Sequence, residues 1–142
     1  MPRLGSAVVE TLGVHHVAFA VEDLDAAITT YERHYAARLE LRDHLESQAV
    51  DGAFLMVGTD RIELVAATAD NSAVGRFLAS RGPGMHHVAI EVVDVATALA
   101  SLQASGAELI DDVPRLGLGG HSVAFVHPNS QHGVLMEVVG HD

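Results

Sequence analysis

Two nine-residue stretches of the chain are near copies of each other, and this duplication constrains the fold more than any other feature. GVHHVAFAV occupies residues 13–21 and GMHHVAIEV occupies residues 84–92, with six of the nine positions identical. His16 and His87 therefore lie 71 positions apart, and an Ala-Phe dipeptide farther along each half recurs at the same spacing. A repeat of this length indicates that half of the chain is one supersecondary unit and that the unit occurs twice.

Each half contains the same predicted order of a strand, a helix and three more strands. Alternating apolar residues predict the strands, and Asp and Gly at the helix ends predict where the helices begin and end. The expected elements of the first half are a strand over 14–21, a helix over 26–37 and strands over 37–44, 51–58 and 61–67. Those of the second half are a strand over 87–93, a helix over 95–105 and strands over 107–111, 121–127 and 134–139.

The predicted fold class is α+β, with two tandem βαβββ modules that form a curled mixed sheet around a metal-binding cleft. We expect a single domain over residues 1–142, because a chain of this length normally forms one core. Module one spans 13–69 and module two spans 84–140. A linker helix lies between them, within 70–83, capped by Asp70-Asn71-Ser72 and stopped by Gly82-Pro83-Gly84.

Composition excludes several classes of function. The formal net charge is −11 and all eight basic residues are arginines, so the chain offers no clustered positive charge for a nucleic acid. No apolar run approaches the roughly 20 residues that a membrane span needs, and the first 12 residues resemble a short tail rather than a signal peptide. The absence of cysteine excludes disulfides and thiolate chemistry. We expect a cytoplasmic protein with a small-molecule partner.

The duplicated strands predict a metal site. Side chains alternate between the faces of a strand, so the two histidines of each His-His pair point in opposite directions. Each module supplies one histidine at the head of its first strand and one glutamate amid apolar residues in its last strand. A single histidine in an apolar strand is more often a core residue than a ligand, but four such residues at repeat-related positions favour ligation of a divalent ion. The candidate ligands are His16, Glu63, His87 and Glu137, and the other histidine of each pair, His15 or His86, is the alternative ligand at this stage.

The repeat resembles the vicinal oxygen chelate superfamily, which includes glyoxalases, bleomycin-resistance proteins and dioxygenases, over about residues 13–139. Three stretches resemble the methylmalonyl-CoA epimerase family in particular: DNSAVGRFLASRGPGMHHVAIEV, DDVPRLGLGGHSVAFVHP and GVLMEVV. The resemblance implies that the four candidate ligands hold one divalent metal ion per chain, which is cobalt, nickel, manganese, zinc or magnesium. It also implies a homodimer.

By this resemblance the chain is an isomerase of propionate metabolism that interconverts (R)- and (S)-methylmalonyl-CoA. The reaction removes a proton between a thioester and a carboxylate and returns it on the other face, through a chelated enolate. Inversion requires an acid or base on each face of the substrate. The resemblance makes Glu137 one of these groups, and the substrate partner is an acyl-CoA thioester.

Two positions depart from the family pattern. Several bacterial members carry a glutamate where this chain has Gly52, which leaves the second proton carrier among Asp51, Glu46, His44 and a metal-bound water. Strand alternation turns Asp51 and Gly52 to opposite faces, and this weakens the case for Asp51. The family commonly has HPK where this chain has HPN, at residues 127–129. Because the chain contains no lysine, an anchor for the substrate phosphates must be an arginine or the backbone, and Arg115 is a candidate.

Other functions use the same fold. A glyoxalase I-like lactoylglutathione lyase would need the same four ligands, so only the linker and loop resemblance favours the epimerase. A ring-cleaving dioxygenase would need two histidines and one glutamate around iron, and the fourth ligand Glu63 argues against it. A non-enzymatic small-molecule-binding protein of this fold would not be expected to retain all four metal ligands.

Overall fold

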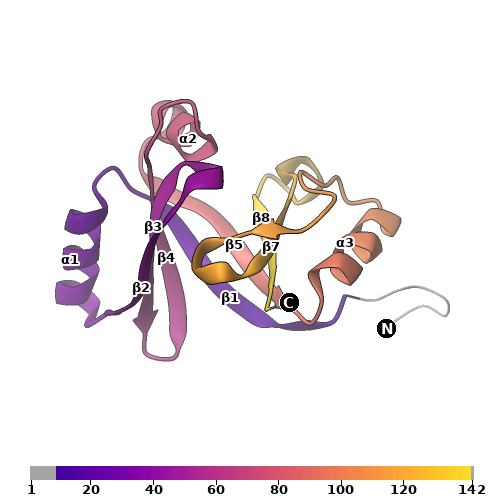
Figure 1. Cartoon of the computed structure of the whole chain (residues 1–142), viewed down its shortest axis with the longest axis horizontal. Coiled ribbons are helices and arrows are strands. Elements are labelled where there is room, and N and C mark those ends of the chain that lie inside the picture. The colour runs from indigo at the N-terminus through magenta and orange to yellow at the C-terminus, as the bar shows by residue number, and fades with distance from the viewer. Residues whose placement is uncertain (1–8, 142) are drawn as a thin grey trace. The chain divides into compact units, whose positions relative to one another are not determined.

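The computed structural model describes residues 9–141; the first eight residues of the predicted tail lie outside this range. In chain order, the strands and helices are β1 (Thr11–Ala20), α1 (Leu24–Tyr35), β2 (Arg38–Leu45), β3 (Val50–Val57), β4 (Asp60–Ala67), α2 (Ala73–Arg81), β5 (Gly84–Val92), α3 (Val95–Ala104), β6 (Arg115–Leu116), β7 (Ser122–Val126) and β8 (Met136–Gly140) (Figure 1). Short 3₁₀ turns cover Glu46–Gln48, Leu118–Gly120 and Pro128–Ser130. The predicted α+β class and the βαβββ order of both modules are confirmed. No helix among residues 9–141 is long and apolar enough to cross a membrane.

The chain divides into two compact units whose boundaries fall within the two His-His pairs. The central unit contains His16 to His86, and the terminal unit contains the described residues up to His15 together with those from His87 onward. The first strand of each module therefore passes from one unit to the other between its two histidines. The expectation of a single domain stays a prediction.

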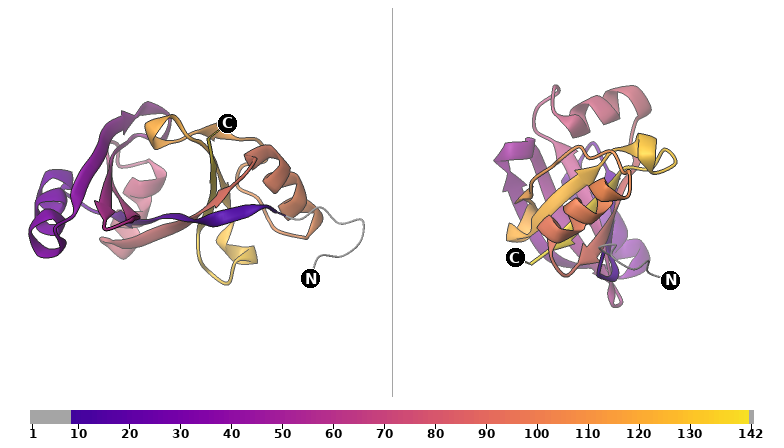
Figure 2. Two further views of the ribbon diagram at one scale, coloured as in Figure 1. Left: turned by 90° about the horizontal axis from the view of Figure 1, so that it is seen from below. Right: turned by 90° about the vertical axis from the view of Figure 1, so that its right-hand side faces the viewer.

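The sheet of the central unit has the strand order β2-β3-β4-β1, in which β1 and β4 run parallel and the other neighbours antiparallel. Side chains of consecutive residues point to opposite faces. Leu64 packs with Leu24 and Ile28 of α1, whereas the next residue, Val65, packs with Val74 of α2. The two helices therefore cover opposite faces of this sheet, as the left panel of Figure 2 shows. Glu63 shares the α2-side face with Val65.

The terminal unit repeats this plan in its sheet β6-β7-β8-β5, in which β5 and β8 run parallel. Val138 of β8 packs against α3 through Val95 and Leu99, and the fully buried Val92 joins the same cluster. Val139 lies on the opposite face, in a small cluster with the neighbouring strands. Burial of these side chains on the α3 face removes apolar surface from water, which is the main favourable contribution to folding.

The prediction of a strand over residues 107–111 is wrong in its position. Leu109 forms one isolated bridge with Val126, and the second strand of the module is β6 instead. The reason is the Asp111 side chain, whose Oδ2 accepts the backbone N–H of Phe125 at 2.9 Å. The Phe125 carbonyl in turn accepts N–H groups from both Ile110 and Asp111, at 3.0 and 3.2 Å. The Asp111 carboxylate thus accepts the Phe125 N–H, which in a regular strand pair would bond to a backbone carbonyl.

Helix α1 begins at Leu24, two residues before its predicted start, because the Asp23 side chain caps it. Its Oδ1 accepts the N–H of Ala26 at 3.0 Å, and Leu24 at the first helical position is buried. The helix ends before the left-handed Ala36 (φ 54°). The predicted glycine end of α3 is confirmed, since Gly106 has φ 92°. The linker helix α2 is also confirmed, with the Ser72 hydroxyl accepting the N–H of Gly75 at 3.0 Å.

We expect Asp23→Ala to lower the free energy of unfolding by about 1 kcal/mol, because the first turn of α1 would lose its side-chain acceptor. Urea denaturation followed by circular dichroism measures this change. Asp23→Ser is the matched control: serine keeps an oxygen at the cap position, and its free energy of unfolding should stay close to that of the parent. Equal losses in both variants would contradict the capping role.

Candidate functional site

The central unit holds one of the predicted histidine–glutamate pairs. His16 in β1 and Glu63 in β4 are buried, with 3% and 6% of their surfaces exposed. The parallel register sets Ala18 beside Glu63, and the His16 Nε2 lies 3.5 Å from Glu63 Oε1. The small side chain of Ala18 next to the carboxylate lets the imidazole and the carboxylate approach each other across the two strands.

The terminal unit holds the second pair in the same arrangement. His87 in β5 and Glu137 in β8 are 5% exposed each, and the His87 Nε2 lies 3.4 Å from Glu137 Oε1. The parallel register sets Ala89 beside Glu137, as Ala18 stands beside the first glutamate. Within each unit, the structure therefore brings together the histidine and the glutamate that the repeat predicts.

An aromatic ring accompanies each pair. Phe54 is the antiparallel partner of Glu63, and Phe125 is that of Glu137. The ring centres lie 5.2 Å from His16 and 5.3 Å from His87, respectively. The sequence reasoning noted the repeated Ala-Phe dipeptide but did not assign these phenylalanines to the site. Their spacing, identical to that of the histidines, was the available signal.

The geometry of each pair fits metal ligation. Nitrogen and oxygen ligands bind divalent ions at about 2.0–2.2 Å, so two of them on one ion lie roughly 3.0–3.5 Å apart. The observed separations of 3.5 and 3.4 Å suit this geometry and are longer than the usual N–H···O hydrogen bond. A buried carboxylate is costly unless a cation or hydrogen bonds offset the loss of water. Imidazole and carboxylate together are the donors that zinc, nickel, cobalt and manganese accept.

The other histidine of each His-His pair lies in a different environment. His86 packs edge-on against Phe77 of α2, with 4.9 Å between ring centres. His15 lies beside His121 and His141, with ring centres 5.1 and 6.2 Å away. This division agrees with the expectation that strand alternation separates the members of each pair.

Two candidates for the second proton carrier, Asp51 and His44, lie in strands of the central sheet, on the face opposite to Glu63. Asp51 pairs with Ala66, which packs with the α1 cluster, whereas Gly52 pairs with Val65 on the face of Glu63. The register also sets His44 beside Asp51. Gly52 itself brings no ionisable group to the site face, so none of these residues places a carboxylate or imidazole beside Glu63.

His44, Asp51 and Glu46 instead form a solvent-exposed network. The His44 Nε2 lies 2.6 Å from Glu46 Oε2, and its Nδ1 lies 2.8 Å from Asp51 Oδ1. These two carboxylates, Glu46 more than Asp51, raise the pKa of His44 above its ordinary value of 6.5 by stabilising the imidazolium.

Arg115 lies at an open hollow of about 220 Å³ in the terminal unit. Its Nε lies 3.2 Å from Asp111 Oδ2, and its guanidinium carbon stands 5.2 Å from the ring centre of Phe125. The hollow is lined by Pro114, Arg115, Leu116, Gly120, His121 and Ser122. These contacts hold the guanidinium in one orientation while it remains partly open to solvent.

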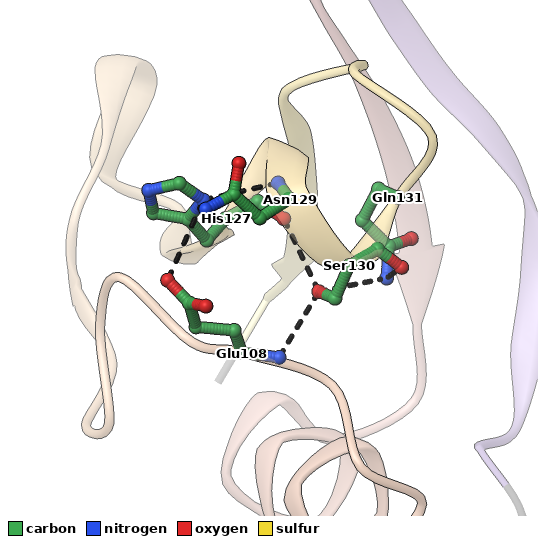
Figure 3. A network of polar contacts seen from close by, with 5 residues as sticks. All are labelled: Glu108, His127, Asn129, Ser130 and Gln131. Carbon is green, nitrogen blue, oxygen red and sulfur yellow. Dashed lines mark hydrogen bonds and ion pairs between the residues drawn. The ribbon is translucent and has the colours of Figure 1, made fainter.

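The side chains of His127 and Ser130 hold the turn that contains the HPN motif (Figure 3). The His127 Nδ1 accepts the backbone N–H of Asn129 at 3.0 Å and lies 3.5 Å from a Glu108 carboxylate oxygen. The Ser130 hydroxyl accepts the N–H of Glu108 at 3.0 Å, which joins the turn to the segment that follows α3. Asn129 therefore contributes to the turn through its backbone N–H rather than through its side chain.

Residues 15–125 match the family model of the Glyoxalase/Bleomycin resistance protein/Dioxygenase superfamily. The chain belongs to this superfamily. A mitochondrial methylmalonyl-CoA epimerase of Dictyostelium discoideum is 32% identical over 127 residues, which cover 88% of this chain and 76% of that protein.

Two solved structures show the same fold. The crystal structure of methylmalonyl-CoA epimerase from Mycobacterium tuberculosis has a TM-score of 0.90 at 31% identity and covers 99% of this chain and 93% of its own. A variant of the Streptomyces coelicolor methylmalonyl-CoA epimerase in complex with 2-nitronate-propionyl-CoA has a TM-score of 0.88 at 32% identity, covering 94% of this chain and 95% of its own.

We expect Glu46→Gln to lower the pKa of His44 more than Asp51→Asn does, because Glu46 is the larger cause of the shift. Titration of the His44 ring protons by nuclear magnetic resonance measures both changes.

A raised pKa of His44 stabilises the folded chain at pH values below the unfolded-state pKa of about 6.5. This stabilisation is lost as the pH rises through the folded-state pKa. The stability lost in Glu46→Gln should therefore be larger at about pH 5.5 than at about pH 9. An unchanged pKa in both variants would show that the network does not form.

Proposed function

We propose that the chain is a metal-dependent epimerase that interconverts (R)- and (S)-methylmalonyl-CoA. The observation that carries the proposal is the presence of both buried His–Glu pairs in a chain similar, over nearly its whole length, to structures of methylmalonyl-CoA epimerases. The glyoxalase I-like alternative would use the same donor residues, and identity to the epimerases at 31–32% over most of the chain favours the epimerase.

In this proposal His16, Glu63, His87 and Glu137 together hold one divalent ion. The two carboxylates balance the two positive charges of the ion, and the two imidazoles are neutral. Four protein ligands leave coordination positions open for other ligands. When bound, the ion supplies a fixed positive charge beside the oxygen on which negative charge develops. The identity of the metal, among cobalt, nickel, manganese, zinc and magnesium, stays open.

Glu137 is the proposed acid–base residue for one face of the substrate. Its carboxylate is buried between Ala89 on one neighbouring strand and Phe125 on the other. One of these neighbours is a large apolar ring and the other a small side chain, so neither brings a polar group to the carboxylate. A carboxylate held in such a place can take a proton from an acidic carbon and return it without competition from bulk water.

The proton carrier for the other face is proposed to be a water molecule. Gly52 has no side-chain group to offer, and Asp51 lies on the α1 side of the central sheet. His44 and Glu46 are engaged in the exposed network with Asp51. Water is therefore the remaining carrier among the candidates that the sequence left open.

Arg115 is the proposed anchor for an anionic part of the acyl-CoA thioester. Asp111 and Phe125 position its guanidinium at the edge of the open hollow, and the chain contains no lysine that could serve instead. A guanidinium binds phosphate oxygens through two parallel hydrogen bonds. The homodimer and the cytoplasmic location stay predictions.

The metal assignment predicts the behaviour of histidine variants. We expect His16→Ala and His87→Ala each to remove most of one divalent ion per chain, because each substitution deletes one imidazole of a shared site. His86→Ala is the matched control, since its ring packs against Phe77 and should leave this ion in place. Elemental analysis of the purified, dialysed proteins measures the loss. Full metal content in both His16→Ala and His87→Ala would contradict the assignment.

The activity is tested by proton exchange of methylmalonyl-CoA in deuterated water, beside a parallel assay with methylglyoxal and glutathione. We expect exchange with the thioester and no turnover of the hemithioacetal; the reverse result would favour the glyoxalase I-like alternative.

Glu137→Gln should slow exchange by about a hundredfold or more, and its metal content is measured alongside because the same residue is a proposed ligand.

Asp51→Asn is the matched control in the exchange assay. It removes a carboxylate only one residue from the Gly52 position but on the other face, so exchange from both epimers should stay within about twofold of the parent. A severe loss at full metal content would show that Asp51 reaches the substrate.

A further inference from the structure

Three histidines from distant parts of the chain meet in the terminal unit, apart from the His87–Glu137 pair. His15 is buried in β1, His121 precedes β7 and His141 follows β8. One ring nitrogen of each lies within 4.8 Å of a ring nitrogen of both others. We propose that these three imidazoles form a second metal site, which takes a divalent transition-metal ion such as Zn²⁺.

Strand pairing explains why two of the rings meet. Ser122 of β7 pairs with Gly140 of β8 in the antiparallel register. The next residues outward along the two strands are His121 and His141, which continue the register as a cross-strand pair. Their ring centres lie 5.0 Å apart. The register therefore fixes this part of the cluster.

The ring geometry suits a shared ion. Imidazoles bound at about 2.0–2.1 Å around a tetrahedral ion place their ring centres roughly 5 Å apart. The three observed separations are 5.1, 6.2 and 5.0 Å, and the planes of all three pairs are inclined by 60° to 75°. Small rotations of the solvent-exposed His141 would equalise the distances. Three neutral imidazoles without thiolates are typical of open zinc sites, in which the fourth position holds water or a ligand.

A carboxylate supports one of the three rings. Glu91 of β5 places Oε2 at 2.7 Å from the His141 Nε2, so the Nδ1 of this ring is the nitrogen that could bind an ion. A carboxylate on the outer nitrogen of a metal-binding imidazole fixes its orientation and makes it a stronger donor. The strongly acidic chain, with a formal charge of −11, also favours uptake of a cation.

The second site is separate from the His87–Glu137 pair. Along β8, His141 follows Glu137 by four residues on the same face, a distance of about 13 Å at 3.2–3.4 Å per residue. Val123 and Val139, both buried, lie between them in a small apolar cluster with Ala89. The spacing is too long for a two-metal centre, in which the ions lie about 4 Å apart. The two sites can therefore be emptied independently.

The test is equilibrium dialysis of the metal-stripped chain against Zn²⁺, with circular dichroism to verify that each variant is folded. We expect about two ions per chain in the parent and about one in His121→Ala and in His141→Ala. His34→Ala is the matched control, because His34 lies on the exposed side of α1, and it should bind two ions. His87→Ala should keep the ion of the three-histidine site, so loss of the proposed epimerase site leaves this result intact.

A finer test uses Glu91→Gln, which should weaken the second ion about tenfold, as the loss of a supporting carboxylate does. Because His141 is exposed, His141→Ala should fold even if substitution near the buried His15 does not. The proposal would be overturned if His121→Ala and His141→Ala bound as many ions as His34→Ala, or if the parent bound no ion. One ion in the parent and none in His87→Ala would also overturn it, whereas one ion in both would mean that only the proposed epimerase site fails to bind.

Discussion

Parallel pairing between the first and last strands of each module is the interaction on which the site depends. It places a glutamate next to an alanine, Glu63 beside Ala18 and Glu137 beside Ala89, and so brings a buried carboxylate within 3.5 Å of a buried imidazole in both units. Removing one partner of a buried charged pair typically costs about 3–5 kcal/mol, because the other is left without compensation. The apolar face of each sheet, packed against α1 or α3, supplies the stability that such a polar face requires.

The two faces of each sheet therefore have different roles: one packs against a helix, and the other carries the buried glutamate. In the central unit, the α1 face carries the apolar packing with α1, while the opposite face carries Glu63 and its aromatic neighbour Phe54 beside the apolar cluster of α2. The terminal unit repeats this division with Glu137 and Phe125. Because adjacent residues along a strand serve different faces, a shift of one residue in register would exchange core and site. Membership of the superfamily and the likeness to epimerase structures fit this arrangement.

The same alternation distinguishes the members of the His-His pairs. His16 and His87 stand beside the buried glutamates, whereas His86 packs with Phe77 and His15 joins two histidines that the sequence analysis did not group. The three-histidine cluster arises because His121 and His141 are the first residues beyond paired strand ends. Residues at such positions are brought together by register and not by any sequence motif, so the repeat gave no sign of them.

The sequence by itself determined the βαβββ order of both halves and the residues of the two buried His–Glu pairs, because a duplication and a period of two are properties of the chain alone. It placed the linker helix and the Gly106 helix end correctly, since capping is local. Only the tertiary structure decided that residues 107–111 form no regular strand, where the Asp111 carboxylate takes the N–H that the ladder would have used. It also decided that His44, Glu46 and Asp51 form an exposed network on the α1 side. Such contacts join residues through strand register and side-chain direction, which local sequence patterns do not specify.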